Sequence, residues 1–265
     1  MPYKRAHWAI AILLLPIVVL AFWKHYFGVL GQAPFGYHAH GITATGWFVL
    51  IAAQSWAIHT RRITLHRSLG LSVFAAVPLF VGAGMLVIQS MAIRYVTKHD
   101  PFAATLGAQI CLHDLVSSAM VAGMVAMALR NRRRVAIHAG YLLGTILLVM
   151  PPVLSRLPLD GIVPDAVMPW LSPGLALLLA AIERRGAEPM LVTFAALVLH
   201  IYVVAPIGQT VAWSQIVVAY AAFSAPALAL VSALAALVAL GMVWIGWRAG
   251  PKSRPRRKPA VAAAI

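Results

Sequence analysis

Charged residues are scarce in this chain, and acidic residues are the scarcest of them. Of 265 residues, only 10% are charged, 6 are Asp or Glu, and a single cysteine, Cys111, is present. One thiol excludes an internal disulfide, and it also excludes zinc fingers and iron–sulfur clusters, which need several cysteine ligands. A soluble domain needs more charge to cover its surface, so the composition indicates a protein whose solvent is largely lipid.

Motifs typical of soluble enzymes are also missing. The chain has no glycine-rich phosphate-binding loop, no serine nucleophile elbow and no nucleic-acid-binding motif. The net charge of +15 would suit nucleic acid. However, the basic residues lie in short clusters between apolar runs, which is the pattern of membrane topology. Nucleic acid is therefore not an expected partner.

Apolar runs make up most of the chain, 62% of which is hydrophobic. We predict an all-α, polytopic transmembrane bundle of about eight helices, because each run can cross a hydrocarbon core of ~30 Å. The segment 189–247 has no charged residue and is too long for one crossing, so we expect a turn at 205–215, where Pro, Gly and polar residues occur. We interpret the first run as a retained helix, since its apolar core is longer than that of a signal peptide. The predicted spans are 6–27, 38–59, 69–93, 102–129, 135–155, 168–182, 189–207 and 216–247.

The distribution of basic residues predicts the orientation. If the N-terminus is cytoplasmic, 17 of the 21 Lys and Arg fall on the cytoplasmic side, as the positive-inside rule requires. We expect both termini in the cytoplasm of a bacterial cell, with a transmembrane domain over 1–247 in the inner (plasma) membrane. The tail 248–265 is expected to be basic and disordered, and to be attracted to anionic lipids. The remaining four basic residues, which this orientation places on the side opposite the cytoplasm, are Lys24, Arg94, Lys98 and Arg156.

Several ionisable or amide side chains lie inside the predicted spans, where they cost free energy and are functional candidates. Asp114 is the only acidic residue well inside a span; it follows His113, and Gln109 lies four residues before that histidine on the same helix face. His40 and Gln54 belong to a polar stripe on the second span, which should face other helices. His200 lies at mid-depth on the seventh span, without an evident partner.

Counting from the basic loops places the histidines at two levels. His40 lies 21 residues from Arg61 and His113 lies 17 residues from Arg130, which corresponds to ~32 Å and ~26 Å along a helix. These two histidines therefore form an outer pair. His66 and His138 lie close to the basic loops and form an inner pair. Two histidines on facing helices at one depth can hold haem, so the pattern predicts two haem b sites, within a central four-helix bundle at about 38–155.

Two long motifs resemble a known group of proteins. The segment "HAHGITATGWFVLIAAQSWAIHTRRITLHRSLG" (38–70) is similar to the His…Gln…His-Arg-x-Leu-Gly pattern of a bacterial multi-pass membrane protein family of unknown function. The segment "LRNRRRVAIHAGYLLGTILLVMPPVLSR" (129–156) is similar to the second half of that pattern. The family in turn resembles two-haem transmembrane cytochromes b. The resemblance implies one haem on His40 and His113 and another on His66 and His138.

Different functions remain open at this stage. An electron-transfer protein would need a quinone or another redox partner. A membrane-embedded, metal-dependent lipid hydrolase would place a metal ion on His38, His40 and His113, since three histidines and a bound water form a catalytic zinc site. A proton-coupled carrier would use Asp114 and His200 as a relay. A non-enzymatic membrane protein would use none of these groups, so the sequence does not decide whether the protein is an enzyme.

Overall fold

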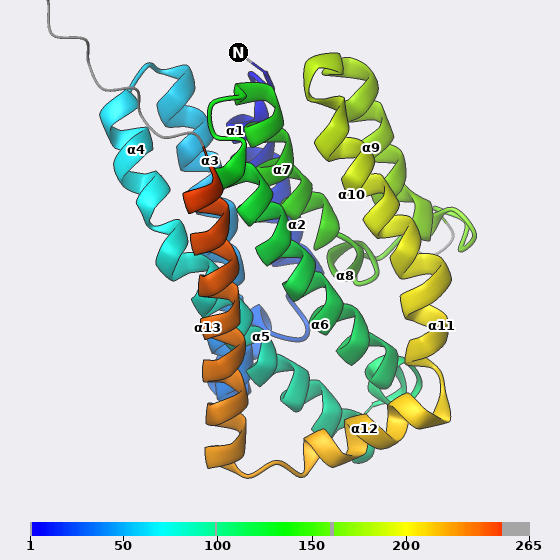
Figure 1. Cartoon of the computed structure of the whole chain (residues 1–265). Helices are drawn as coiled ribbons and strands as arrows, with labels where there is room; N and C mark the ends of the chain where they lie inside the picture. Colours follow the sequence, from blue (N-terminus) through cyan, green and yellow to red (C-terminus); the bar gives the residue numbers. More distant parts are fainter. Residues whose placement is uncertain (1, 99, 160–161, 251–265) are drawn as a thin grey trace, which may run out of the picture.

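The computed structural model describes residues 2–98, 100–159 and 162–250. All regular structure in these segments is helical, which confirms the all-α prediction (Figure 1). Six helices are long and apolar enough to cross a membrane, and three shorter apolar helices accompany them. The long ones are Phe35–His59, Ile63–Val96, Pro101–Arg130, Val135–Leu154, Arg184–Gly208 and Ala225–Ala249; the shorter ones are Ala6–Ala21, Met168–Ile182 and Val211–Ala221.

Most long spans consist of more than one helical element. The chain begins with α1 (Ala6–Trp8), a π-helical segment η1 (Ala9–Leu14) and α2 (Leu15–Ala21), and a short 3-10 segment η2 (Phe27–Gln32) follows. The next elements are α3 (Phe35–His59), α4 (Ile63–Leu71), α5 (Val73–Val96), α6 (Pro101–Arg130), α7 (Val135–Leu148) and α8 (Pro151–Leu154). After these come η3 (Met168–Trp170), α9 (Leu171–Ile182), η4 (Arg184–Gly186), α10 (Ala187–Leu199), η5 (His200–Val204), α11 (Ala205–Gly208), α12 (Val211–Ala221) and α13 (Ala225–Ala249).

Three predicted boundaries are wrong. The first helical run ends at Ala21 rather than at residue 27, and it is one of the shorter apolar helices. The third span begins at Ile63 rather than at residue 69, so His66 lies within α4 and not ahead of the helix. The predicted eighth span, 216–247, is interrupted at 222–224: α12 ends at Ala221 and α13 begins at Ala225. The cause of this break is local, because the Ser224 side chain accepts from the Ala227 N–H and Pro226 follows at the start of α13.

Helix α12 does not cross the membrane. Its 11 residues span ~16 Å, about half of a hydrocarbon core, and it lies across the lower end of the bundle in Figure 1. Its indole Trp213 Nε1 donates to the Ala108 carbonyl at 2.7 Å and the Tyr220 hydroxyl donates to the Met85 carbonyl at 2.9 Å. These bonds attach α12 to α6 and α5.

The centre of the bundle consists of α3, α5, α6 and α7, with α13 packed on α5 and α6. Helix α5 packs against α3, α6 and α13, and α6 also packs against α7. Helix α3 touches α7 over a short stretch, where the buried Trp47 Nε1 donates to the Thr145 hydroxyl at 2.9 Å. Since α3 and α6 share α5 and α7 as neighbours, they lie across the bundle from each other.

The outer surface of the bundle is apolar. On α13, the exposed fractions of Leu237, Val238 and Ile245 are 62%, 64% and 67%. A row of such side chains on a helix with a single charged residue, Arg248, would be unstable in water, and it is the expected surface of a helix in lipid. The chain is therefore an integral, multi-pass membrane protein.

The basic loops gather at one end of the molecule, called the basic end below. The N-terminus meets the α9–α10 turn through a Tyr3 hydroxyl bond to the Gly186 carbonyl (3.4 Å), and the α6–α7 turn meets the end of α13 through a bond from Arg132 to the Trp247 carbonyl (2.8 Å). The N-terminus and the end of α13 accordingly lie together at the top of Figure 1. The opposite end, with α12 and the α5–α6 turn, is called the cavity end.

Candidate functional site

A cavity of about 180 Å³ lies between the central helices, near the cavity end. α3 and α6 contribute opposite walls, and α2, α5 and the α8 region complete it. Most of its lining is apolar, with the aromatic rings of Phe22, Phe48, Phe80 and Phe102. Its polar groups are few and converge from separate helices, which is the usual composition of a ligand site.

His40 reaches the cavity from α3. Its ring packs against the Phe80 ring, with centroids 5.4 Å apart. The Nδ1 atom is buried and has no hydrogen-bond partner among the described residues. A buried polar atom without a partner costs free energy, so an unsatisfied imidazole beside a cavity indicates a bound group.

His113 reaches the same cavity from α6, on the opposite side. Its Nδ1 donates to the Asp114 carboxylate at 3.4 Å, so Nε2 is left with a lone pair. Nε2 is buried and has no partner in the part of the chain that is described. A histidine whose second nitrogen is held by a carboxylate is the arrangement that orients metal-binding imidazoles.

His200 lies directly beside His113, a neighbour that the sequence did not reveal. The two ring centroids are 4.6 Å apart. His200 Nδ1 donates to the Ala196 carbonyl at 2.9 Å, so its Nε2 accepts from the Ser117 hydroxyl at 3.1 Å. Asp114, His113, His200 and Ser117 thus form a polar chain from the cavity into α10 and η5.

A local feature of the sequence explains the position of His200. It begins the π-helical segment η5, and Pro206 follows shortly after. Proline has no N–H and its ring crowds the carbonyl four residues earlier, so the turn before it widens. Pro16 follows the other π-helical segment, η1, in the same way. Pro206 was the available signal that residue 200 has an unusual environment.

The inner pair is organised differently. His66 Nδ1 donates to the Gln54 carbonyl at 3.3 Å, and His138 Nδ1 donates to the Ala128 carbonyl at 2.8 Å. Each Nδ1 therefore carries the proton, and each Nε2 has a free lone pair. Neither imidazole lines the cavity of the outer pair.

The other predicted site residues are dispersed. His38 turns away to Tyr26, whose hydroxyl lies 3.2 Å from His38 Nδ1. Gln109 accepts a hydrogen bond from Gln209 at 2.9 Å, at the cavity end. The Gln54 side chain is buried and its Oε1 has no partner among the described residues. Over the described ranges, no three His, Cys, Asp or Glu side chains could hold a metal ion, so His38, His40 and His113 do not form a common metal site.

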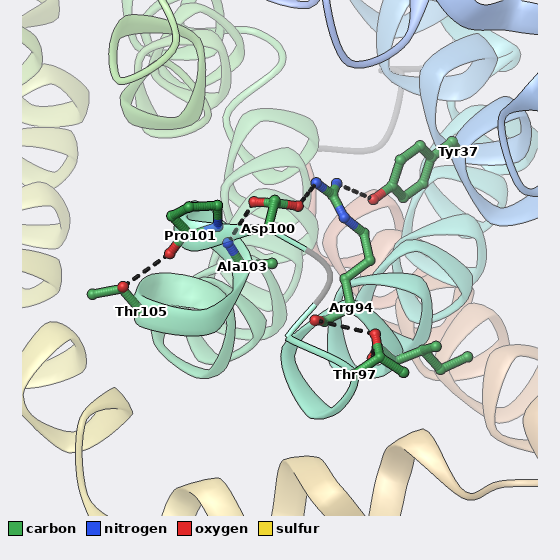
Figure 2. A network of polar contacts seen from close by, with 8 residues as sticks. Tyr37, Arg94, Thr97, Asp100, Pro101, Ala103 and Thr105 are labelled. Carbon is green, nitrogen blue, oxygen red and sulfur yellow. Dashed lines mark hydrogen bonds and ion pairs between the residues drawn. The ribbon is translucent and has the colours of Figure 1, made fainter.

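Two arginines lie at the mouth of the cavity. Arg94, near the end of α5, donates to the Tyr37 hydroxyl at 2.7 Å and forms an ion pair with Asp100 (Figure 2). Asp100 also accepts from the Ala103 N–H at 2.9 Å and so caps the start of α6. Arg156 follows α8 and lines the cavity from the other side. Both arginines belong to the four basic residues that the charge rule placed away from the basic loops.

These observations define an integral membrane bundle with a small, mostly apolar cavity toward one end, which His40 and His113 line. Comparisons with protein families, with curated proteins and with solved structures find no match to this chain. The likeness to the membrane family and to cytochromes b stays a prediction.

Proposed function

We propose that the protein binds haem b and passes electrons across the membrane. The observation that carries the proposal is the outer pair: His40 and His113 come from opposite sides of one aromatic-lined cavity, and each has a buried ring nitrogen without a hydrogen-bond partner in the described chain. Two neutral imidazoles facing across an apolar slot are the donor set of a bis-histidine haem.

The donor atoms at the cavity suit this cofactor, but the cavity of about 180 Å³ is smaller than a haem, so binding would require α3 and α6 to move apart. His113 would bind through Nε2, because Asp114 already holds its Nδ1. Phe80 packs on the His40 ring and restricts its orientation. When bound, haem supplies a one-electron couple, and the apolar walls exclude water from it.

The proposal extends to a second haem at the inner pair, where the donor atoms alone support it and the helices would have to move apart to admit the group. His66 and His138 each donate Nδ1–H to a backbone carbonyl, which leaves both Nε2 atoms available as ligands. Two haems at different depths would connect the two faces of the bilayer, with a quinone or another redox protein as partner.

An absorption spectrum of the detergent-purified, full-length protein tests this function. The wild type is expected to show bis-imidazole haem bands, and His40→Ala and His113→Ala are each expected to lose the outer haem. The matched control is His38→Ala, on the same helix but directed to Tyr26, which should keep its haem. The proposal fails if haem-supplied wild type shows no such bands, or if both variants keep the full haem content.

The proposed orientation puts the basic end in the cytoplasm of a bacterial inner membrane. The attraction of the basic tail to anionic lipid belongs to the same proposal, although 251–265 of that tail lie outside the described residues. Labelling of single cysteines in intact cells, in a Cys111→Ala background, tests the orientation. A cysteine at residue 24 should react with an impermeant reagent and one at residue 133 should not; the reverse result would invert the topology.

A proton-coupled carrier is the second candidate, because Asp114, His113 and His200 are neighbours in the structure. The carboxylate lies 3.4 Å from His113 Nδ1, and the two imidazole centroids are 4.6 Å apart. Such a series of ionisable groups inside a membrane is typical of proton pathways. Proton uptake by vesicles that contain the wild type, abolished by Asp114→Asn in protein without haem, would favour the carrier.

A further inference from the structure

Arg156 occupies an unusual environment at the mouth of the cavity. Its guanidinium lies over the Phe22 ring at 4.9 Å and over the Phe102 ring at 5.2 Å. Its Nη1 donates to the Pro152 carbonyl at 2.6 Å. The aromatic rings hold the plane of the group in place while its free edge borders the cavity.

Most of the hydrogen-bonding capacity of Arg156 is unused. A guanidinium has five N–H donors, and the bond to Pro152 is the single side-chain bond found for Arg156 within the described segments. No carboxylate there forms an ion pair with it, since Asp100 pairs with Arg94 and Asp114 faces His113. Burial lowers the pKa of Arg156 below its ordinary value. Arg156 is half-buried, and a partly desolvated cation without an anion is costly.

Arg94, which also lines the cavity, has an unused donor. Its terminal nitrogens are taken by Tyr37 and Asp100, whereas its Nε is buried and has no partner among the described residues. Because Asp100 balances the charge of Arg94, Arg156 is the arginine at the mouth that has no ion-pair partner among the residues that the structure describes.

We propose that Arg156 and the Nε–H of Arg94 bind a carboxylate group at the mouth of the cavity. A planar, singly charged carboxylate matches the guanidinium edge and balances one unpaired cation, whereas a phosphate dianion would bring excess negative charge close to Asp114. The carboxylate has two possible sources, a side chain of the haem itself or a small free acid. Only the first source depends on the proposed function.

The test uses full-length protein produced with and without haem, and sodium propionate as the probe against sodium chloride at equal ionic strength. In haem-free wild type, the melting temperature should rise with propionate concentration until the binding site is saturated. Arg156→Gln should abolish this rise, because a lost charge-assisted pair weakens binding on the order of tenfold or more. Lys24→Gln, an exposed basic residue at the same end, should leave it unchanged.

Haem-loaded protein distinguishes the two sources. If a haem carboxylate fills the site, propionate no longer raises the melting temperature, and Arg156→Gln lowers the haem midpoint potential because a positive charge is lost. If a free acid is the ligand, propionate still acts on the loaded protein. The proposal is wrong if haem-free wild type ignores propionate and Arg156→Gln also leaves the potential unchanged.

A conservative variant, Arg156→Lys, provides a second test in case Arg156→Gln does not fold. Arg156→Lys keeps the positive charge but loses the planar fork, so it should bind propionate more weakly than the wild type and more tightly than Arg156→Gln. If Arg156→Gln does not fold, equal propionate affinity in Arg156→Lys and wild type would overturn the geometry proposed. If no preparation contains haem, the proposed function fails while the propionate titration still decides this site.

Discussion

The two ends of the bundle hold their histidines in opposite ways. At the cavity end, His40 and His113 have buried ring nitrogens without partners in the described chain, and an open space separates their helices. Nearer the basic end, His66 and His138 each donate Nδ1–H to a carbonyl of a neighbouring helix. The outer imidazoles are therefore oriented by packing and by one carboxylate, and the inner ones by backbone hydrogen bonds.

Packing density differs along with the hydrogen bonding. Beside the outer pair, Ala44 borders the cavity. Beside the inner pair, a Cβ on Gly140 would lie 2.9 Å from the Pro189 side chain, so α7 and α10 are already in close contact there. Space for a ligand is thus available next to His40 but not next to Gly140. Substitutions that add side-chain volume should therefore have different effects on stability in the two regions.

Ala44→Phe and Gly140→Val should give the largest contrast. Ala44→Phe is expected to remove the outer haem, while the free energy of unfolding of the haem-free protein changes by about 1 kcal/mol or less because the new ring occupies empty space. Overpacking at Gly140 should lower the free energy of unfolding by ~1–3 kcal/mol. Haem content and unfolding in detergent measure the two effects; full haem content in Ala44→Phe would contradict the assigned site.

Ser117→Ala should have an intermediate effect. It leaves His200 Nε2 without the hydroxyl that now donates to it, which is expected to cost ~1–2 kcal/mol of unfolding free energy. The control is Ser118→Ala, which removes a hydroxyl with no side-chain hydrogen bond within the described ranges. Thermal unfolding of both variants is the measurement, and equal losses would mean that the His200 bond contributes nothing specific.

Asp100→Asn should have the smallest effect. Asparagine caps α6 as well as aspartate does, and the partly exposed ion pair with Arg94 is lost, an expected change of about 1 kcal/mol or less. Asp100→Ala also removes the cap and should cost ~1 kcal/mol more. If Asn and Ala are equally destabilising, the ion pair rather than the cap stabilises this turn.

Periodicity and length were sufficient to predict most helices, but not how they end. The uncharged run after residue 189 predicted apolar helices, but its hydropathy did not indicate the break before α13. That break depends on the capping hydroxyl of Ser224 and the proline that follows, a local signal within an apolar segment. The sixth helical segment was predicted as 168–182, and Met168–Ile182 is a short apolar helix in the structure. Local caps, and not hydropathy, decide such boundaries.

The candidate site was accessible from the sequence only in part. Counting along helices placed His40 and His113 at one level, and both line one cavity. The count could not reveal His200 beside His113, because it depends on how α10 packs against α7 and on the widened turn before Pro206. It also could not distinguish His38 from His40, which differ by ~160° around the helix and by their neighbours.

The sequence by itself determined the solvent, the helical class and the grouping of most positive charge, because burying so many apolar residues beside so few charges has few solutions in water and a simple one in lipid. Tertiary structure decided which imidazoles are left without partners. That outcome depends on the relative rotation and spacing of helices far apart in the chain, which set whether a nitrogen meets a carbonyl, a carboxylate or an open cavity.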